Sequence, residues 1–326
     1  MARPGTDAYR MRALLCYIVK FVLLPVAVLL AASLAWLRWD AGRPLGDYFD
    51  ARHGALVGGQ ELDTDRSAGQ VSRLLRITSS SGLSVSVRLI RPAEAAGPLP
   101  VMIVLGGHRT GSEAVDLFGE VGNRAIVALD YPYAGPQRIR GIGQVIEAAP
   151  LARRAFIDTP PAVSLVIDWL LAEPWVDAGE VVIVGASLGV PFAALAAARD
   201  PRITAALLVH GAADNRAWIR TQVARRVDTS LMHGPLATLV WWLAHGPSFD
   251  TAANAARISP RPVLVVGARE DERTETWQTE ALFDAAVEPK KLRWTEGQHV
   301  QPGRTGIVAD LLRVADEERP FYTAKR

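Results

Sequence analysis

The stretch VVIVGASLG, residues 181–189, decides how this chain is expected to fold. Its four continuous apolar residues predict a strand buried on both faces, as in a parallel sheet. The G-x-S-x-G pattern that follows opens a run of small residues that suits a helix. Such a turn holds its central serine, Ser187, in a strained backbone conformation. Glycines at 185 and 189 are needed because strand and helix approach closely there.

Short apolar runs of the same kind recur along the chain. They are Val101–Leu105, Ala125–Leu129, Ala205–Val209 and Val263–Val266. Helix-compatible stretches lie between them, at 112–121, 161–172, 188–199 and 274–286. The alternation predicts an α/β fold with a mostly parallel central sheet, flanked by helices through right-handed crossovers.

The remaining segments complete this domain. Residues 71–79 and 84–91 alternate and predict a β-hairpin, whereas 290–295 predicts a last strand and 305–317 a closing helix. Residues 213–258 lie between two predicted strands and are too long for an ordinary connection. We interpret 213–258 as a helical insertion, either a lid over a substrate pocket or a packed subdomain without a direct role.

The N-terminal part predicts a transmembrane helix or signal anchor. Residues 14–37 carry one charge, Lys20. As a helix they would extend about 36 Å, which exceeds a hydrocarbon core of about 30 Å. The charged residues up to Lys20 are Arg3, Asp7, Arg10, Arg12 and Lys20 itself. This basic excess predicts a cytoplasmic N-terminus at 1–13 and a catalytic domain outside the cytoplasm, in a periplasm-like compartment. Secretion after signal cleavage is the alternative.

Composition excludes several other classes of protein. A net charge of +2 over 326 residues argues against a nucleic-acid binder. The single cysteine excludes a disulfide framework and a cysteine-based zinc site. No histidine spacing resembles a metal site. Residues 38–70 are rich in Gly, Asp and Arg and are interpreted as a linker, so that the domain is expected to span 71–326.

Two further reactive groups follow predicted strands. Asp271 comes shortly after Val263–Val266, and His299 shortly after 290–295. Because the carboxyl ends of parallel strands meet at one edge of a sheet, we expect both side chains to converge on Ser187. A serine hydroxyl needs a base to attack a carbonyl, and that base needs an orienting acid.

The order serine, acid, histidine and the loop LGGHRTG at 105–111 resemble the α/β-hydrolase superfamily, in its dienelactone-hydrolase and prolyl-oligopeptidase-like branch. The resemblance covers about residues 71–320. It implies that Ser187 is the nucleophile, His299 the general base and Asp271 the acid that fixes the histidine tautomer.

The resemblance leaves alternatives for two of the roles. Glu270 competes with Asp271 as the acid, and Asp214 is a weaker candidate because the acid follows the preceding strand in some members. The implied oxyanion hole pairs the backbone N–H of Leu188 with that of Gly107, with His108 as the rival donor.

Together these features predict a membrane-anchored serine hydrolase. The expected activity is that of a carboxylesterase, which forms an acyl-enzyme and acts on a small-molecule ester or acyl substrate without a cofactor or metal. A serine peptidase or acyltransferase of the same fold is the alternative, as is a non-catalytic binding protein on a hydrolase scaffold. The oligomeric state is left open.

Overall fold

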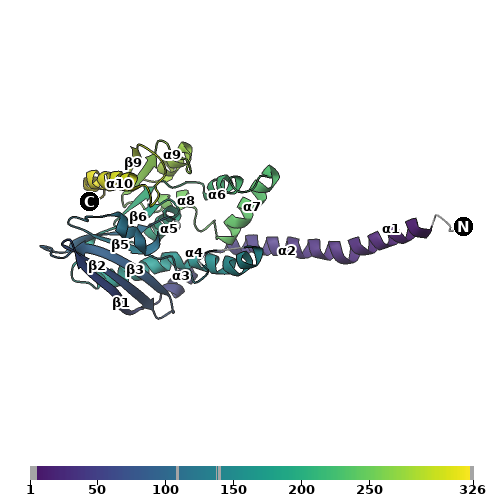
Figure 1. The fold of residues 1–326 in the computed structure, drawn as a ribbon, viewed down its shortest axis with the longest axis horizontal. Coiled ribbons are helices and arrows are strands. Elements are labelled where there is room, and N and C mark those ends of the chain that lie inside the picture. The colour runs from purple at the N-terminus through teal and green to yellow at the C-terminus, as the bar shows by residue number, and fades with distance from the viewer. Residues whose placement is uncertain (1–5, 108–109, 137, 139–140, 324–326) are drawn as a thin grey trace. The chain divides into compact units, whose positions relative to one another are not determined.

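The structure is a computed structural model that describes residues 6–107, 110–136, 138 and 141–323. The chain divides into two compact units, Met1–Arg43 and Pro44–Arg326. The first is helical and the second contains the sheet (Figure 1).

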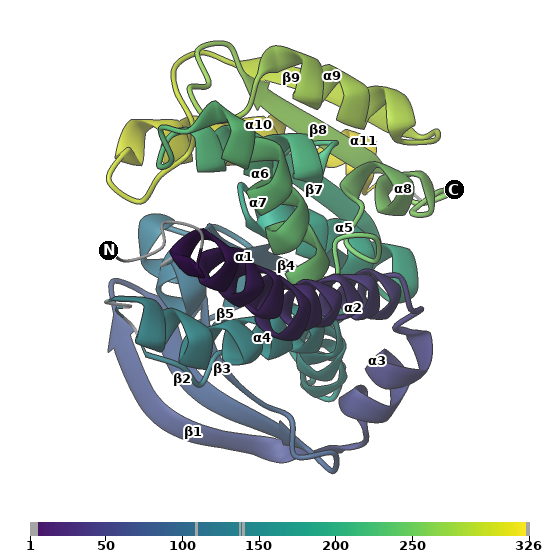
Figure 2. The same ribbon diagram turned by 90° about the vertical axis from the view of Figure 1, so that its right-hand side faces the viewer.

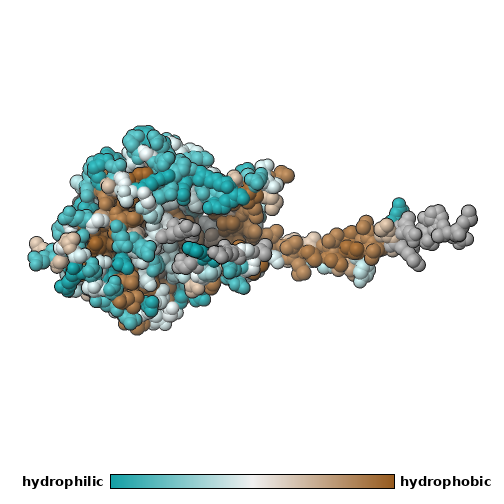
Figure 3. All heavy atoms as spheres, viewed as in Figure 1, coloured by the Kyte–Doolittle hydropathy of each residue, from teal (hydrophilic) through white to brown (hydrophobic). Residues whose placement is uncertain are grey.

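The first unit consists of α1 (Thr6–Ile18), a π-helical segment η1 (Val19–Leu23) and α2 (Leu24–Ala41). Pro25 lies at the start of α2 and has no N–H to donate, which accounts for a change of helical register just before it. Within Met11–Ala41 the mean hydropathy reaches 2.6, and apolar side chains are exposed along the helix (Figure 3). The helix is long and apolar enough for a membrane span, and a signal sequence would have the same properties.

A nine-stranded sheet forms the centre of the described part of the second unit, in the order β1-β2-β3-β5-β4-β6-β7-β8-β9. The strands are β1 (Leu56–Ser67), β2 (Gln70–Ser79), β3 (Ser84–Pro92), β4 (Leu99–Leu105), β5 (Ala125–Leu129), β6 (Val176–Ala186), β7 (Ala205–Val209), β8 (Val263–Ala268) and β9 (Lys290–Thr295). Strands β1 to β3 are antiparallel, and all pairs from β5 to β9 are parallel. The mostly parallel sheet with flanking helices confirms the predicted α/β architecture.

Helices cover both faces of this sheet (Figure 2). They are α3 (Gly46–His53), the 3-10 helix η2 (Gly111–Leu117), α4 (Gly141–Leu171), α5 (Gly189–Arg199), α6 (Asn215–Ala224), α7 (Ser230–Leu243), α8 (Thr251–Ala256), α9 (Thr276–Ala285), α10 (Thr305–Glu317) and α11 (Arg319–Tyr322). The larger core lies between the sheet and α3, α4, α5, α8 and α9. The smaller core lies between the opposite face and η2, α10 and α11.

An aromatic cluster fixes α5 in the larger core. Phe192 of α5 is fully buried, and its ring centroid lies 5.0 Å from that of Phe156, 5.2 Å from that of Phe249 and 5.3 Å from that of Tyr131. Tilted and edge-to-face ring pairs of this kind contribute about 0.5–1.5 kcal/mol each beyond the area that they bury. The cluster therefore anchors the helix that begins beside Ser187.

The prediction that residues 38–70 form a linker is wrong, because most of them form helices and a strand. The helix of the first unit continues to Ala41, and α3 and β1 occupy most of the remainder. Strand β1 lies at the edge of the sheet with most of its side chains exposed, and backbone pairing with β2 holds it there. It therefore lacks the apolar alternation by which a half-buried strand is recognised.

Two predicted helices have different bounds. The helix expected at 112–121 is the short 3-10 helix η2, and that expected at 161–172 is the end of the 31-residue α4. Three prolines inside α4, Pro150, Pro160 and Pro161, mimic helix boundaries in the sequence. The insertion at 213–258 is helical as predicted, since it contains α6, α7 and α8.

The turn between β6 and α5 requires its two glycines. A Cβ on Gly189 would lie 1.9 Å from the carbonyl oxygen of Leu105 in β4, and one on Gly185 would lie 2.8 Å from the carbonyl oxygen of Gly189. Both distances are too short for any side chain. The close contact of β4, β6 and α5 thus fixes where the helix begins.

Substitution Gly189→Ala should lower the free energy of unfolding by about 1–3 kcal/mol or more, because overpacking forces the backbone of β4 or α5 to move. Thermal unfolding of the two proteins measures the loss. Gly234→Ala in α7 is the matched control, since a Cβ there meets no atom within 4 Å. Equal melting temperatures for wild type and Gly189→Ala would contradict the packing argument.

Candidate active site

Ser187 follows directly after β6 in a strained conformation. Its φ is +55°, in the left-handed region that costs a residue with a side chain about 1–3 kcal/mol. The Ser187 N–H donates to the carbonyl of Val209 at 2.9 Å, and its carbonyl accepts from the N–H of Val190 at 3.1 Å. These two bonds hold the serine between β7 and α5, at the carboxyl edge of the sheet.

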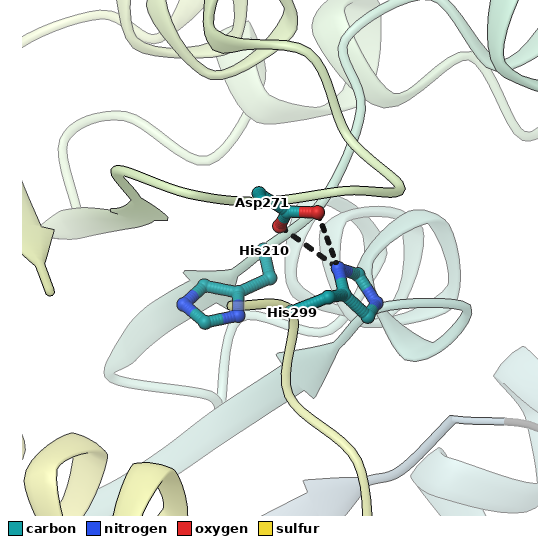
Figure 4. Close-up of side chains that lie close together, drawn as sticks. All are labelled: His210, Asp271 and His299. Carbon is teal, nitrogen blue, oxygen red and sulfur yellow. Dashed lines mark hydrogen bonds and ion pairs between the residues drawn. The ribbon is translucent and has the colours of Figure 1, made fainter. Parts of the chain in front are cut away.

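The structure brings Ser187, His299 and Asp271 together. His299 Nε2 lies 2.7 Å from Ser187 Oγ, and His299 Nδ1 lies 2.8 Å from Asp271 Oδ2 and 3.0 Å from Oδ1. Figure 4 shows both carboxylate oxygens facing the imidazole. The side chains of His299 and Asp271 are 1% and 4% exposed, so their hydrogen bond is shielded from water.

The hydrogen-bond pattern defines what each ring nitrogen can do. A carboxylate can only accept, so Nδ1 of His299 carries a proton, and Nε2 is left to accept the proton of the Ser187 hydroxyl. The Asp271 carboxylate is itself oriented by its own loop. Its Oδ1 accepts from the backbone N–H groups of Arg273 and Thr274, each at 2.8 Å.

Glu272 and Arg304 hold the loop that carries His299. Glu272 Oε2 accepts from the His299 N–H at 3.0 Å, while Arg304 Nη1 donates to the His299 carbonyl at 2.6 Å and to Glu272 Oε1 at 2.8 Å. Desolvation raises the pKa of Glu272, but hydrogen bonds from the His299 N–H and from Arg304 outweigh it and lower the pKa to about 2. Both backbone polar groups of His299 are thereby fixed by side chains.

His210, the residue that directly follows β7, supports the same loop. Its Nδ1 accepts from the N–H of Val300 at 3.0 Å, and its ring centroid lies 5.7 Å from that of His299 (Figure 4). Burial lowers the pKa of His210 to about 4, although the charge of Asp271 opposes the shift. The ring is therefore neutral near pH 7 and packs beside His299 without adding a charge.

The predicted oxyanion loop lies against Ser187. A Cβ on Gly107 would lie 3.7 Å from Cβ of Ser187. The Gly106 carbonyl accepts from the Tyr131 hydroxyl at 2.7 Å, and the Gly107 carbonyl accepts from Thr110 Oγ1 at 2.8 Å. In a trans peptide the N–H points opposite to the preceding carbonyl, so Tyr131 fixes the direction of the Gly107 N–H.

The other predicted donors are less well defined. Leu188 immediately precedes α5, so its N–H belongs to the unpaired amides at a helix N-terminus. His108, the rival donor, lies outside the described residues. Burial raises the pKa of the Tyr131 hydroxyl above its ordinary range, which keeps it protonated as a donor to Gly106.

Neither alternative acid reaches the site as the structure is arranged. Asp214 caps α6, where Oδ1 accepts from the N–H of Ala217 at 2.9 Å. Glu270 has an exposed side chain. The carboxylate bonded to His299 is that of Asp271.

One group of side chains in the described part of the chain has the spacing of a metal site. Ligand atoms of His210, Asp271 and His299 lie within 4.8 Å of one another. Their hydrogen bonds fit a proton relay better than a cation site. His210 Nδ1 accepts from an amide, and both nitrogens of His299 bond to Ser187 and Asp271. A metal ion would have to displace these bonds.

A cavity of about 990 Å³ opens beside the serine. Ser187, Leu188, Gly106 and Gly107 line it, together with side chains from η2, α6, α7 and α10. Ligand pockets in proteins usually measure about 300–1,000 Å³, so this cavity accommodates a sizeable organic molecule.

Comparisons with known proteins agree with this architecture. A sequence profile of the prolyl oligopeptidase family matches residues 161–301, which include Ser187, Asp271 and His299. No curated protein sequence gives a significant match.

Several solved structures share the fold. Acetyl xylan esterase 1 from a Thermoanaerobacterium species has a TM-score of 0.59 at 17% identity, covering 85% of this chain and 96% of that one. An acetyl xylan esterase from a Paenibacillus species has a TM-score of 0.61 at 17% identity, with 86% and 99% covered. A glucuronoyl esterase from Solibacter usitatus has a TM-score of 0.51 at 14% identity, with 84% and 92% covered.

The sheet and the serine turn have the α/β-hydrolase fold that these solved structures share. Within that fold, residues 161–301 are similar to the prolyl oligopeptidase family.

Sequence reasoning missed Glu272, Arg304 and the role of Tyr131. Glu272 is the last of three consecutive acidic residues after β8, and of these the sequence indicates a catalytic role only for Glu270 and Asp271. Arg304 follows His299 by five residues in a segment without periodicity. The signal in the sequence that could have identified Glu272 and Arg304 is their closeness to Asp271 and His299.

Substitution Glu272→Gln tests the charge on this loop. The folded-state pKa is lowered, so the stabilisation by Glu272 is complete above its ordinary value of 4.5 and is lost as the pH falls toward about 2. Wild type should therefore melt above the variant at pH 7, with a gap that closes between pH 4.5 and 2. Glu296→Gln is the control, because Glu296 is 86% exposed and lies 3.9 Å from its nearest cation. A difference in melting temperature that does not change with pH would contradict a stabilising role for the Glu272 charge.

Proposed function

We propose that this protein is a serine hydrolase that cleaves carboxylic esters. One observation carries the proposal: an unbroken chain of hydrogen bonds from Ser187 Oγ through His299 to the buried carboxylate of Asp271. A hydroxyl, a base and an acid in this order activate a weak nucleophile. The strained turn presents that hydroxyl to the cavity.

The reaction proceeds in two halves. Ser187 Oγ attacks the acyl carbon while His299 Nε2 takes its proton, and the carbonyl oxygen becomes an oxyanion that accepts N–H bonds from Gly107 and Leu188. The intermediate collapses, and His299 returns the proton to the departing alcohol. Water then attacks the acyl-enzyme with His299 again as base, which releases the acid and regenerates Ser187.

The ester reaction is preferred over peptide cleavage for two reasons. The cavity lining is mainly apolar, and polar groups that would recognise a peptide backbone are few in it. In addition, solved proteins of this fold bear the names of esterases. Peptide hydrolysis is the second candidate, since the matched profile is that of a peptidase family.

The proposal includes attachment to a membrane through α1, η1 and α2. The apolar length of Met11–Ala41 supports a single span, and the basic residues near its start support a cytoplasmic N-terminus. The catalytic unit is then Pro44–Arg326, outside the cytoplasm. A cleaved signal sequence would give a secreted enzyme with the same catalytic unit.

Substitution Ser187→Ala should reduce hydrolysis of p-nitrophenyl butyrate to the background rate, because the attacking atom is removed. The measurement is the release of p-nitrophenolate by the purified full-length protein. Ser84→Ala, an exposed position in β3, is the control and should retain wild-type turnover. Unchanged turnover in Ser187→Ala would contradict the proposal, and inactivity of the folded wild type would favour a binding protein on this fold.

Substitution Tyr131→Phe tests the oxyanion loop, because it removes the hydroxyl that holds the Gly106 carbonyl. Loss of an oxyanion donor lowers kcat about 10²–10³-fold, so a variant in which the donor is present but misdirected should have a kcat that is lower by about tenfold. KM should change little, since the hole acts in the transition state. A rise in KM at constant kcat would indicate that Tyr131 only shapes the pocket.

A further inference from the structure

The cavity beside Ser187 extends along one face of the parallel sheet. Four strands contribute a row of paired residues to its floor: Val104 pairs with Val184, Val184 with Leu207, and Leu207 with Leu264. Residues two apart along a strand face the same side. A second row accordingly follows toward the serine, in which Val209 lies between Ala186 and Val266.

The other walls of the cavity are also apolar. Val308 and Leu311 of α10 line the cavity, as do Ile219 of α6 and Leu236 of α7. The polar side chains of the lining come from α6, the segment that follows it, the serine turn and the loops after β4, β8 and β9; they are Thr110, Ser187, Gln222, Arg226, Arg273 and Gln301. The lining is therefore suited to an unbranched hydrocarbon that starts at the acyl carbon on Ser187.

Different elements cover the two faces of the sheet. The face opposite the cavity packs against α3, α4, α5, α8 and α9. On the cavity side, the connection from β4 to β5 contributes only the seven-residue 3-10 helix η2, where a longer helix was expected from the sequence. The cavity lies beside η2 and is lined in addition by α6, α7 and α10.

From these observations we infer that the substrate is an ester of a medium- or long-chain fatty acid, whose acyl chain lies along the floor formed by β4, β6, β7 and β8. The inference rests on the proposed function, since it assigns the acyl carbon to Ser187. An acetyl group has a single methyl beyond the carbonyl and would leave most of the 990 Å³ cavity unfilled. A longer chain removes apolar surface from water with each added methylene.

The test is a series of p-nitrophenyl esters from acetate to decanoate, hydrolysed by the full-length protein in lipid nanodiscs, where no detergent competes for the cavity. Each buried methylene should raise kcat/KM by up to about fourfold, the value that corresponds to hydrocarbon transfer. A series that is flat or that falls from acetate onward would overturn the inference and leave the serine hydrolase intact. Absence of hydrolysis for every ester would contradict both.

A pair of neighbouring substitutions on α10 localises the effect. Val308 lines the cavity and is 6% exposed, whereas Ala309 is exposed and does not line it. Val308→Trp should lower the ratio of kcat/KM for decanoate to kcat/KM for acetate at least about tenfold, because the larger side chain fills part of the cavity. A tenfold loss corresponds to fewer than two buried methylene groups. Ala309→Trp should retain the wild-type ratio. Equal ratios in both variants would overturn the assignment of the chain to this cavity, and the wild-type series decides by itself if Val308→Trp fails to fold.

Discussion

Parallel pairing of β6, β7, β8 and β9 is the constraint on which the whole site depends. Ala186 at the end of β6 pairs with Val209 of β7, which pairs with Val266 of β8, and Ala268 of β8 pairs with Thr295 of β9. These in-register ends bring together segments more than a hundred residues apart. The serine, the acid and the histidine then need only short loops to reach one another, and those loops are fixed by the local bonds of Glu272, Arg304 and Thr274.

Most of this arrangement could be predicted from sequence because it follows from short-range rules. Continuous apolar runs identify buried parallel strands, and Gly185 and Gly189 identify the turn whose packing against Leu105 excludes a side chain. The order of strands then implies which loops share an edge. The position after the strand and the resemblance favour Asp271 in the sequence but leave Glu270 as a rival. The loop after β8 distinguishes the two carboxylates, because it directs Asp271 to His299.

What sequence reasoning missed depends on tertiary contacts. Strand β1 is exposed on the edge of the sheet and is stabilised by backbone pairing, which leaves no apolar pattern to detect. The prolines of α4 interrupt the local signal of a helix that packing nevertheless maintains. Tyr131 and Arg304 each donate a hydrogen bond to a backbone carbonyl in a distant or irregular segment, and Arg304 also donates to Glu272. No spacing rule identifies such bonds.

The central claim is that Ser187 Oγ is a nucleophile activated by His299. Mapping the adduct formed by a fluorophosphonate on the full-length protein, by mass spectrometry of its peptides, tests it most directly. The account predicts a single adduct per chain on Ser187, formed far more slowly after His299→Gln. Folded protein that forms no adduct, or forms it on a different serine, would contradict the account.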